Sequence, residues 1–415
     1  MLGRSTGALR HRDFRLLWLG ESVSQTGSAA TKVMLPLVAV TTLNADSFTM
    51  GLLGAAAWVP WLVIGLPAGA WIDRVRRRPV MIGCNTASAV LLFWTMAAAW
   101  WGMLTIGQLL AVALLSGAAN VFFVAAYSAY IPSLLPPADL TDGNAKLQMS
   151  EAAAEVVAPS AGGALAQAGG AVLGCLVDGL TFLLSVLMLT RIRSRESPVA
   201  RRPRGERSLG REIREGIGFL AGDPYLRTIL ACDAGMNLFL AGTQAVEIVF
   251  LSRTVGLSGG LIGALMAAVG LGGVAGALLS PWLARTVGTA RAVLLCAFCG
   301  GPFGLLIPLT SDGPGLLVFL VGQFCLTACI VAGNVVIVSF RQSYCPPGML
   351  GRVSAGIRFL MYGTLPIGSL LGGALGGALG DRDALWVLYL GNALCALLLL
   401  RGPLRTERAL PVSTG

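Results

Sequence analysis

The sequence predicts an all-α membrane protein with twelve transmembrane helices, arranged as two pseudo-symmetric six-helix bundles. Three observations lead to this prediction. First, 55% of the 415 residues are hydrophobic and only 12% are charged, whereas soluble domains carry about 25% charged residues. Second, apolar stretches long enough to cross a bilayer, which takes about 20 residues per helix, recur along the chain. Third, an arginine-rich segment separates these stretches into two sets of six.

The first half of the chain, residues 1–190, begins with a basic segment that ends at Arg15. Basic segments are retained on the cytoplasmic side during insertion, so we expect the N-terminus there. The first apolar stretch is interrupted by polar residues and lacks a small-residue cleavage site, which favours a retained helix over a signal peptide. The predicted spans of this half are 16–42, 49–72, 79–101, 105–131, 147–168 and 171–190.

The composition changes after the sixth span. Residues 191–215 contain nine basic residues, all arginine, with Ser, Pro and Gly between them. We interpret residues 191–222 as a cytoplasmic linker in which residues 208–221 form an amphipathic surface helix, with Ser208 as its N-cap. The second bundle is predicted at 223–402, followed by a cytoplasmic tail at 403–415. Its predicted spans are 226–251, 259–283, 291–310, 315–340, 354–378 and 384–400.

The positive net charge of +10 does not indicate nucleic acid. The arginines lie in loops predicted on one side of the membrane, where positive-inside topology and anionic lipid headgroups explain them. Only Arg253 and Arg382 fall on the predicted outer side. We therefore expect a multi-pass protein of the cell membrane with both termini in the cytoplasm, and we expect a monomer.

Polar residues recur on one face of four predicted spans. A polar residue in the hydrocarbon region is costly, so it should face the bundle interior or a wet cavity. Positions four, seven and eleven apart share a helix face. The stripes fall on spans 1, 4, 7 and 10, and we predict that these helices line a common central path. Their residues are Glu21, Gln25, Ser28 and Lys32; Ser116, Asn120, Tyr127 and Tyr130; Asp233, Asn237, Gln244 and Glu247; and Gln323, Thr327 and Asn334, with Arg341 at the inner end.

The sequence contains no pattern of an enzyme site. A phosphate-binding glycine loop is absent, which argues against ATP as the energy source. We interpret the nine cysteines, most of which lie inside apolar runs, as small membrane-embedded thiols, and the only histidine, His11, lies in the basic N-terminal segment. We therefore predict no cofactor and no metal, and an ion gradient, most often of protons, as the driving force.

A proton carrier needs a buried carboxylate, because burial disfavours the charged form. Three of the candidates also have a structural interpretation: an interfacial charge for Glu21, a hydrogen-bonding role for Asp178, and pairing with Arg253 for Glu247. Lys32 shares the helix face of Glu21. The candidate carboxylates are Glu21, Asp178, Asp233 and Glu247.

The turn between spans 2 and 3 carries a family resemblance. It resembles the loop signature G-x-L-A-D-R-x-G-R-R of the major facilitator superfamily, with Trp71 and Arg76 as departures. Between spans 8 and 9, residues 280–288 resemble a decayed copy, in which Ala284 replaces the aspartate. The resemblance implies an inner gate in which Asp73 pairs with a residue of span 11, such as Arg352; the alternative is a topology anchor. The matching residues are Gly69, Asp73, Arg74, Arg77 and Arg78.

Span 5 contains a second resemblance. Pro159, Gly162 and Gly163 match the end of the antiporter signature, G-P-x-x-G-G, and allow the helix to bend and pack closely. Segments 12–18, 73–83 and 351–353 are most similar to the macrolide-efflux and enterobactin-exporter branch. The resemblance, over residues 8–400, implies a proton-driven exporter of amphipathic small molecules, such as antibiotics, that works by alternating access.

Three alternatives share the same fold. The chain could be a dedicated exporter of one metabolite, such as a siderophore, or an importer. It could also be a sensor that does not transport, although the carboxylates on the stripes argue against that interpretation.

Overall fold

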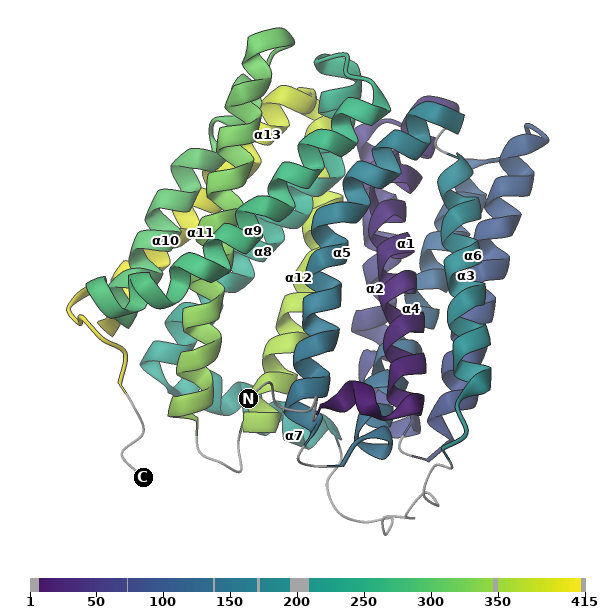
Figure 1. Cartoon of the computed structure of the whole chain (residues 1–415). Helices are drawn as coiled ribbons and strands as arrows, with labels where there is room; N and C mark the ends of the chain where they lie inside the picture. Colours follow the sequence, from purple (N-terminus) through teal and green to yellow (C-terminus); the bar gives the residue numbers. More distant parts are fainter. Residues whose placement is uncertain are drawn as a thin grey trace, which may run out of the picture. The chain divides into compact units, whose positions relative to one another are not determined.

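The computed structural model describes residues 7–72, 74–136, 139–169, 172–194, 209–345 and 350–411, and these residues form an all-helical protein (Figure 1). The predicted fold class is thereby confirmed. Short 3-10 or π turns lie at Ala8–Arg10, Phe250–Thr254, Ile307–Leu309, Gly313–Gly315, Ala396–Arg401 and Pro403–Arg405. The helices are α1 (Arg12–Thr42), α2 (Ser47–Ile72), α3 (Arg77–Trp100), α4 (Ile106–Leu134), α5 (Leu140–Gly169), α6 (Val172–Arg191), α7 (Leu209–Gly222), α8 (Pro224–Val249), α9 (Gly259–Val287), α10 (Thr289–Gly304), α11 (Leu316–Tyr344), α12 (Leu350–Leu379) and α13 (Asp381–Cys395).

Ten helical segments of the described chain are long and apolar enough to cross a membrane. The two remaining long helices, α1 and α5, are more polar, and both contribute carboxylates to the cavity described below. The predicted bounds differ most at α5, which begins at Leu140 instead of residue 147. Helix α4 also continues past Pro132 to Leu134, because a proline in the last turn removes only one backbone hydrogen bond.

Contacts between residues divide the chain into two compact units. Unit 1 contains Met1–Ala45, Ala56–Gly205 and Ser258–Ala267. Unit 2 contains Asp46–Ala55, Glu206–Leu257 and Ala268–Gly415. The predicted division into two halves at the linker stays a prediction.

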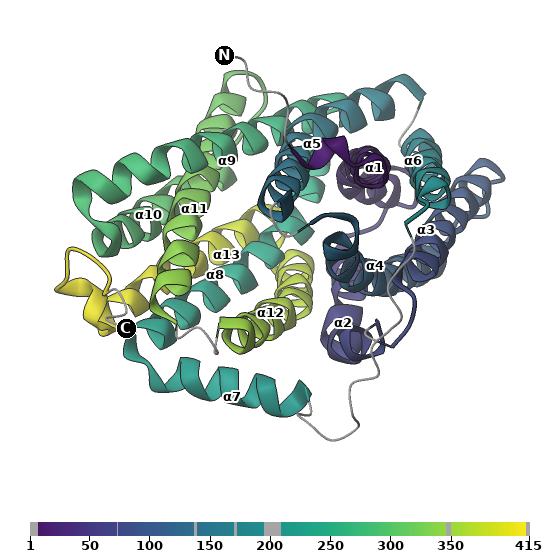
Figure 2. The same ribbon diagram turned by 60° about the horizontal axis from the view of Figure 1, so that its bottom comes forward.

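In unit 1, helix α1 packs against α5 and α6, and α3 packs against α4 and α6. Figures 1 and 2 both show α1 between α5 and α6. The contact of α1 with α5 is close at Gly162, where a Cβ atom would lie 3.2 Å from the backbone of Ala30. One apolar core of the unit includes the fully buried side chains of Phe14, Met81 and Tyr130.

In unit 2, helix α8 packs against α12 and α13, and α10 packs against α11. Helix α7 packs against the first turns of α12, where Gly356 lies beside Ile217 and Leu220 (Figure 2). The C-terminal residues up to Pro411 also belong to this packing. Leu404 and Leu410 are buried, and the amide of Leu410 donates a hydrogen bond of 2.8 Å to Thr289 Oγ1 at the start of α10. Residues 404–410 are therefore held against the helices of unit 2.

Candidate functional site

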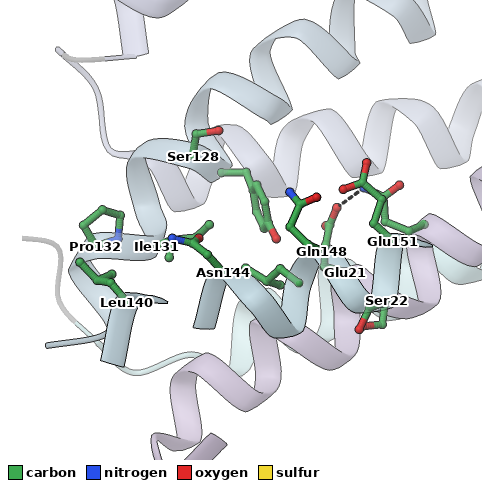
Figure 3. A pocket seen from close by; sticks show the side chains of 13 residues that line it. Glu21, Ser22, Ser128, Ile131, Pro132, Leu140, Asn144, Gln148 and Glu151 are labelled. Atoms are coloured by element: carbon green, nitrogen blue, oxygen red, sulfur yellow. Dashed lines mark hydrogen bonds between the residues drawn. The ribbon is translucent and has the colours of Figure 1, made fainter. Parts of the chain in front are cut away.

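Unit 1 encloses a cavity of about 260 Å³ between α1, α4 and α5 (Figure 3). Its wall combines two carboxylates, several amide and hydroxyl groups, and an apolar end. No Lys, Arg or His side chain of the described chain lines it. The lining residues are Glu21, Ser22, Gln25, Tyr127, Ser128, Ile131, Pro132, Leu140, Asn144, Leu147, Gln148, Ser150 and Glu151.

Glu21 of α1 is the buried carboxylate of this cavity, with an exposed fraction of 7%. Gln25, one turn further along the same helix, donates a hydrogen bond of 2.7 Å to its Oε1. Glu151 of α5 lines the same cavity, and Figure 3 shows Glu21, Gln148 and Glu151 close together. The sequence therefore folds two like charges from different helices into one small space.

The opposite end of the cavity is apolar. Ile131, Pro132 and Leu140 line it from α4 and α5 (left in Figure 3). Tyr127 of α4 stacks on Phe123, with ring centroids 5.9 Å apart. The cavity therefore combines an acidic end with an apolar and aromatic end, which suits an amphipathic ligand.

Contacts at the start of α5 fix this helix against the N-terminal segment. Trp18 of α1 donates a hydrogen bond of 2.8 Å to Ser150 Oγ. Asp142 accepts bonds of 2.8 Å from Lys146 Nζ and from the amide of Ala8. The bond with Lys146 and the bond with Ala8 lower the pKa of Asp142 below its ordinary value. Lys146, the lysine of α5, is thereby paired with Asp142.

Unit 2 holds a different carboxylate on α8. Glu247 is 6% exposed. Gln323 of α11 donates a hydrogen bond of 2.5 Å to Glu247 Oε1, and the hydroxyl of Tyr389 of α13 lies 3.4 Å from Oε2. Both carboxylate oxygens of Glu247 thus have partners from other helices. Arg253, which the sequence suggested as the partner of Glu247, has an exposed side chain and no described contact with Glu247.

Two further stripe residues of α8, Asp233 and Asn237, lie closer to its N-terminal end. Asp233 lines a small pocket of about 10 Å³ together with Arg341 of α11. Asn237 donates hydrogen bonds of 2.9 Å to the carbonyl of Met361 and 3.0 Å to Thr364 Oγ1, both on α12. Asn237 therefore links two helices of unit 2.

The remaining candidate residues are not among those that line the unit 1 cavity. Asp178 of α6 is 2% exposed, accepts a hydrogen bond of 3.1 Å from Thr181 Oγ1, and packs where Gly27 of α1 leaves space for it. Four stripe residues have exposed side chains: Lys32, Asn120, Gln244 and Asn334. Whether spans 1, 4, 7 and 10 share one path stays a prediction.

The basic turn between α2 and α3 is described in part. Arg78 donates hydrogen bonds of 2.7 Å to the carbonyl of Leu189 and 2.5 Å to that of Thr190, at the C-terminal end of α6. Arg74 is exposed, and Arg77 begins α3. Asp73 lies outside the described residues. Three residues within helices are described by their backbone alone: Pro159, Gly163 and Arg352.

Several cavity residues of α5 are absent from the sequence-based candidates: Asn144, Gln148, Ser150 and Glu151. The signal was present, because Asn144, Gln148 and Glu151 are spaced by four and three residues and so share a helix face. For Tyr389 no periodic set of polar residues marks the helix face, since this residue lies in a largely apolar span.

An all-helical, multi-pass protein with a polar cavity inside a helical unit has the architecture of a membrane transporter. The sequence comparison makes this specific: residues 17–364 match the model of the Major Facilitator Superfamily. The chain belongs to this family, whose members are transporters and not enzymes. A curated relative, the uncharacterized MFS-type transporter y4rN of Sinorhizobium fredii (strain NBRC 101917 / NGR234), is 25% identical over 331 residues, 78% of each chain.

Solved transporter structures share the fold. A point mutant of the nucleoside transporter NupG superimposes with a TM-score of 0.76 at 14% identity, covering 94% of this chain and 99% of that one. A bacterial homologue of the iron transporter ferroportin, in an inward-facing state, gives 0.75 at 16% identity, covering 95% and 99%. At such identities the likeness concerns the fold alone.

Proposed function

We propose that this transporter exports amphipathic small molecules by alternating access in exchange for protons, and that the unit 1 cavity is part of its transport path. The observation that carries the proposal is the setting of Glu21. This carboxylate is almost fully buried, yet it faces a cavity instead of a closed set of partners. A buried carboxylate without a basic neighbour favours uptake of a proton, and the cavity offers room for a substrate beside it.

The contacts at one end of unit 1 support the proposed topology. Arg78 bonds to the end of α6, just before the arginine-rich linker. Asp13, at the start of α1, accepts a hydrogen bond of 2.7 Å from the amide of Ser194 in that linker. The N-terminus, the basic turn and the linker thus meet at one end of the unit. Following the positive-inside rule, we assign this end to the cytoplasm of a cell-membrane protein.

Export, rather than import, is supported by the antiporter-like segment of α5. Gly162 in this segment contacts Ala30 of α1, so the segment packs against the helix that carries Glu21. Asp73, Arg74, Arg77 and Arg78 form the proposed inner gate. The nucleoside and iron transporters that share the fold differ in substrate, so the substrate is not inferred from them.

The experiment measures accumulation of a panel of fluorescent and antibiotic compounds in cells that lack their own pumps. Cells producing this protein should accumulate less of a substrate, and a protonophore should abolish the difference. Glu21→Gln should remove export, because the amide fills the same space but does not exchange a proton. Asp312→Asn, an exposed loop residue, is the control for loss of one negative charge.

Unchanged accumulation for every compound would contradict broad export and favour a dedicated exporter of one metabolite. Raised accumulation of a compound would show import. Full export by the Glu21→Gln protein would exclude Glu21 as the proton carrier.

A further inference from the structure

We propose that the unit 1 cavity binds a small organic cation, an amine or quaternary ammonium group attached to an apolar body, with Glu21 and Glu151 as its charge partners. The inference rests on the proposed function in taking the cavity as a substrate site. It adds the chemical class of the substrate, which the transporter fold does not specify.

The first argument is the sign of the charge on the cavity wall. Both ionisable carboxylates, Glu21 and Glu151, lie on the same wall, and the thirteen lining residues include no basic side chain. Lys146, on the same helix as Glu151, is bonded to Asp142. An anionic ligand would be repelled by this wall, whereas a cation would offset the repulsion between the two carboxylates.

The second argument is the unused hydrogen-bonding capacity of the carboxylates. A carboxylate has about four acceptor positions, and among the described residues only Gln25 donates to Glu21. Glu21 is nevertheless more than nine-tenths buried and lines the cavity. No described side chain donates a hydrogen bond to Glu151, which is exposed. A ligand that carries positive charge or N–H donors would fill these positions.

The third argument is the shape and chemistry of the rest of the wall. Tyr127 presents an aromatic ring, and Ile131, Leu140 and Leu147 provide apolar surface. Aromatic rings attract cations at their faces. The volume of about 260 Å³ lies just below the roughly 300 Å³ at which sites for drug-sized ligands begin. The cavity therefore suits a compact cation rather than a large macrocycle.

The test is equilibrium binding of radiolabelled benzyltrimethylammonium to the purified full-length protein in lipid nanodiscs. Neopentylbenzene, which has carbon in place of the charged nitrogen, is the neutral competitor of nearly the same shape. The cation should bind saturably, and neopentylbenzene should not displace it. Glu151→Gln should weaken binding about tenfold or more, as should Glu21→Gln. Tyr127→Leu should weaken it about two- to fivefold.

Glu151→Gln is the decisive variant, because this side chain is exposed and no described side chain bonds to it, so the protein should fold normally. Its thermal unfolding is recorded beside that of Asp312→Asn, the variant with the same charge change outside the cavity, whose affinity should be unchanged. An unchanged affinity in Glu151→Gln, equal displacement by neopentylbenzene, or no saturable binding would each overturn the proposal.

The result is separable from the proposed function. Export of neutral compounds that depends on Glu21, without binding of the cation, would leave the transporter proposal standing and refute the cation site. Carboxylate-dependent binding of the cation without export of any compound would support the cation site and refute proton-driven export.

Discussion

Two glutamates with almost equal exposure have opposite surroundings in the two units. Glu21 of α1 is 7% exposed and Glu247 of α8 is 6% exposed. The described partner of Glu21 is Gln25 on the same helix, so this hydrogen bond does not link α1 to another helix. Glu247 has partners on α11 and α13, and its contacts join three helices. The fraction buried thus does not distinguish a carboxylate available to a ligand from one that holds a bundle together; the partners do.

The comparison leads to different expectations for the two residues. Changes at Glu21 should affect transport more than stability, because few contacts of the fold depend on it. Changes at Glu247 should affect the stability of unit 2, although the sequence alone makes it an equal candidate for proton coupling. Glu247→Ala and a double substitution at Glu247 and Gln323 test this contrast directly, and substitutions at Arg78 and Asp142 have smaller expected effects.

The largest effect is expected for Glu247→Ala. The substitution leaves the amide of Gln323 without its partner inside the unit, whereas the hydroxyl of Tyr389 keeps Thr243 as a partner. An unpaired buried group costs about 1–3 kcal/mol, so the free energy of unfolding should fall by about 1–3 kcal/mol. Thermal unfolding of the purified protein measures the change, with Glu21→Ala as the matched control that should lose less. An unchanged unfolding temperature together with lost transport would instead make Glu247 a coupling residue.

A double substitution sharpens this prediction. Replacing both partners of a buried polar pair by apolar residues of similar size is often nearly neutral, because no group remains unpaired. Glu247→Leu combined with Gln323→Leu should therefore be more stable than Glu247→Leu alone. A double variant as unstable as the sum of the two single variants would show that the two side chains act independently.

A medium effect is expected for Arg78→Ala, which removes two hydrogen bonds to the C-terminal end of α6. Bonds made by a charged group contribute about 1.5–3 kcal/mol when shielded. Arg78 is partly exposed, so about 1–2 kcal/mol is expected in total. The rate of amide hydrogen exchange at the C-terminal end of α6 should rise. Arg78→Lys should restore part of the protection against exchange. In unit 2, Arg408→Ala should have a smaller effect, because its single recorded bond, to the carbonyl of Thr286, is 3.4 Å long.

The smallest effect is expected for Asp142→Asn, at the exposed start of α5. Its folded-state pKa is lowered by Lys146 and Ala8, so its contribution is present above the unfolded pKa and is lost as the pH falls through the folded pKa. The variant should thus unfold at a slightly lower temperature at neutral pH. The difference should begin to shrink as the pH falls below the ordinary aspartate pKa of about 3.9, and it should disappear below the lowered folded-state pKa. A difference that persists in acid would point to a loss other than the charge.

The structure also shows where hydropathy alone was insufficient. The sequence places span 5 at 147–168, but α5 begins at Leu140. Asp142 and Lys146 are four residues apart and form an ion pair of 2.8 Å, which supports helix in a polar segment. A count of apolar residues does not detect this polar first part of α5. The same count finds α2 and α3, because residues 49–72 and 79–100 carry no charge.

The amino-acid sequence alone was enough to predict the helices, their apolar character and the family. These properties depend on composition and on spacing along one helix, and both can be read without knowing the neighbours. It also showed that Glu21 and Glu247 each lie on a polar stripe. Only the tertiary structure placed Glu151 beside Glu21 and enclosed Glu247 with Gln323 and Tyr389. The physical reason is that helical periodicity specifies which residues share a face, while packing of other helices decides what covers that face.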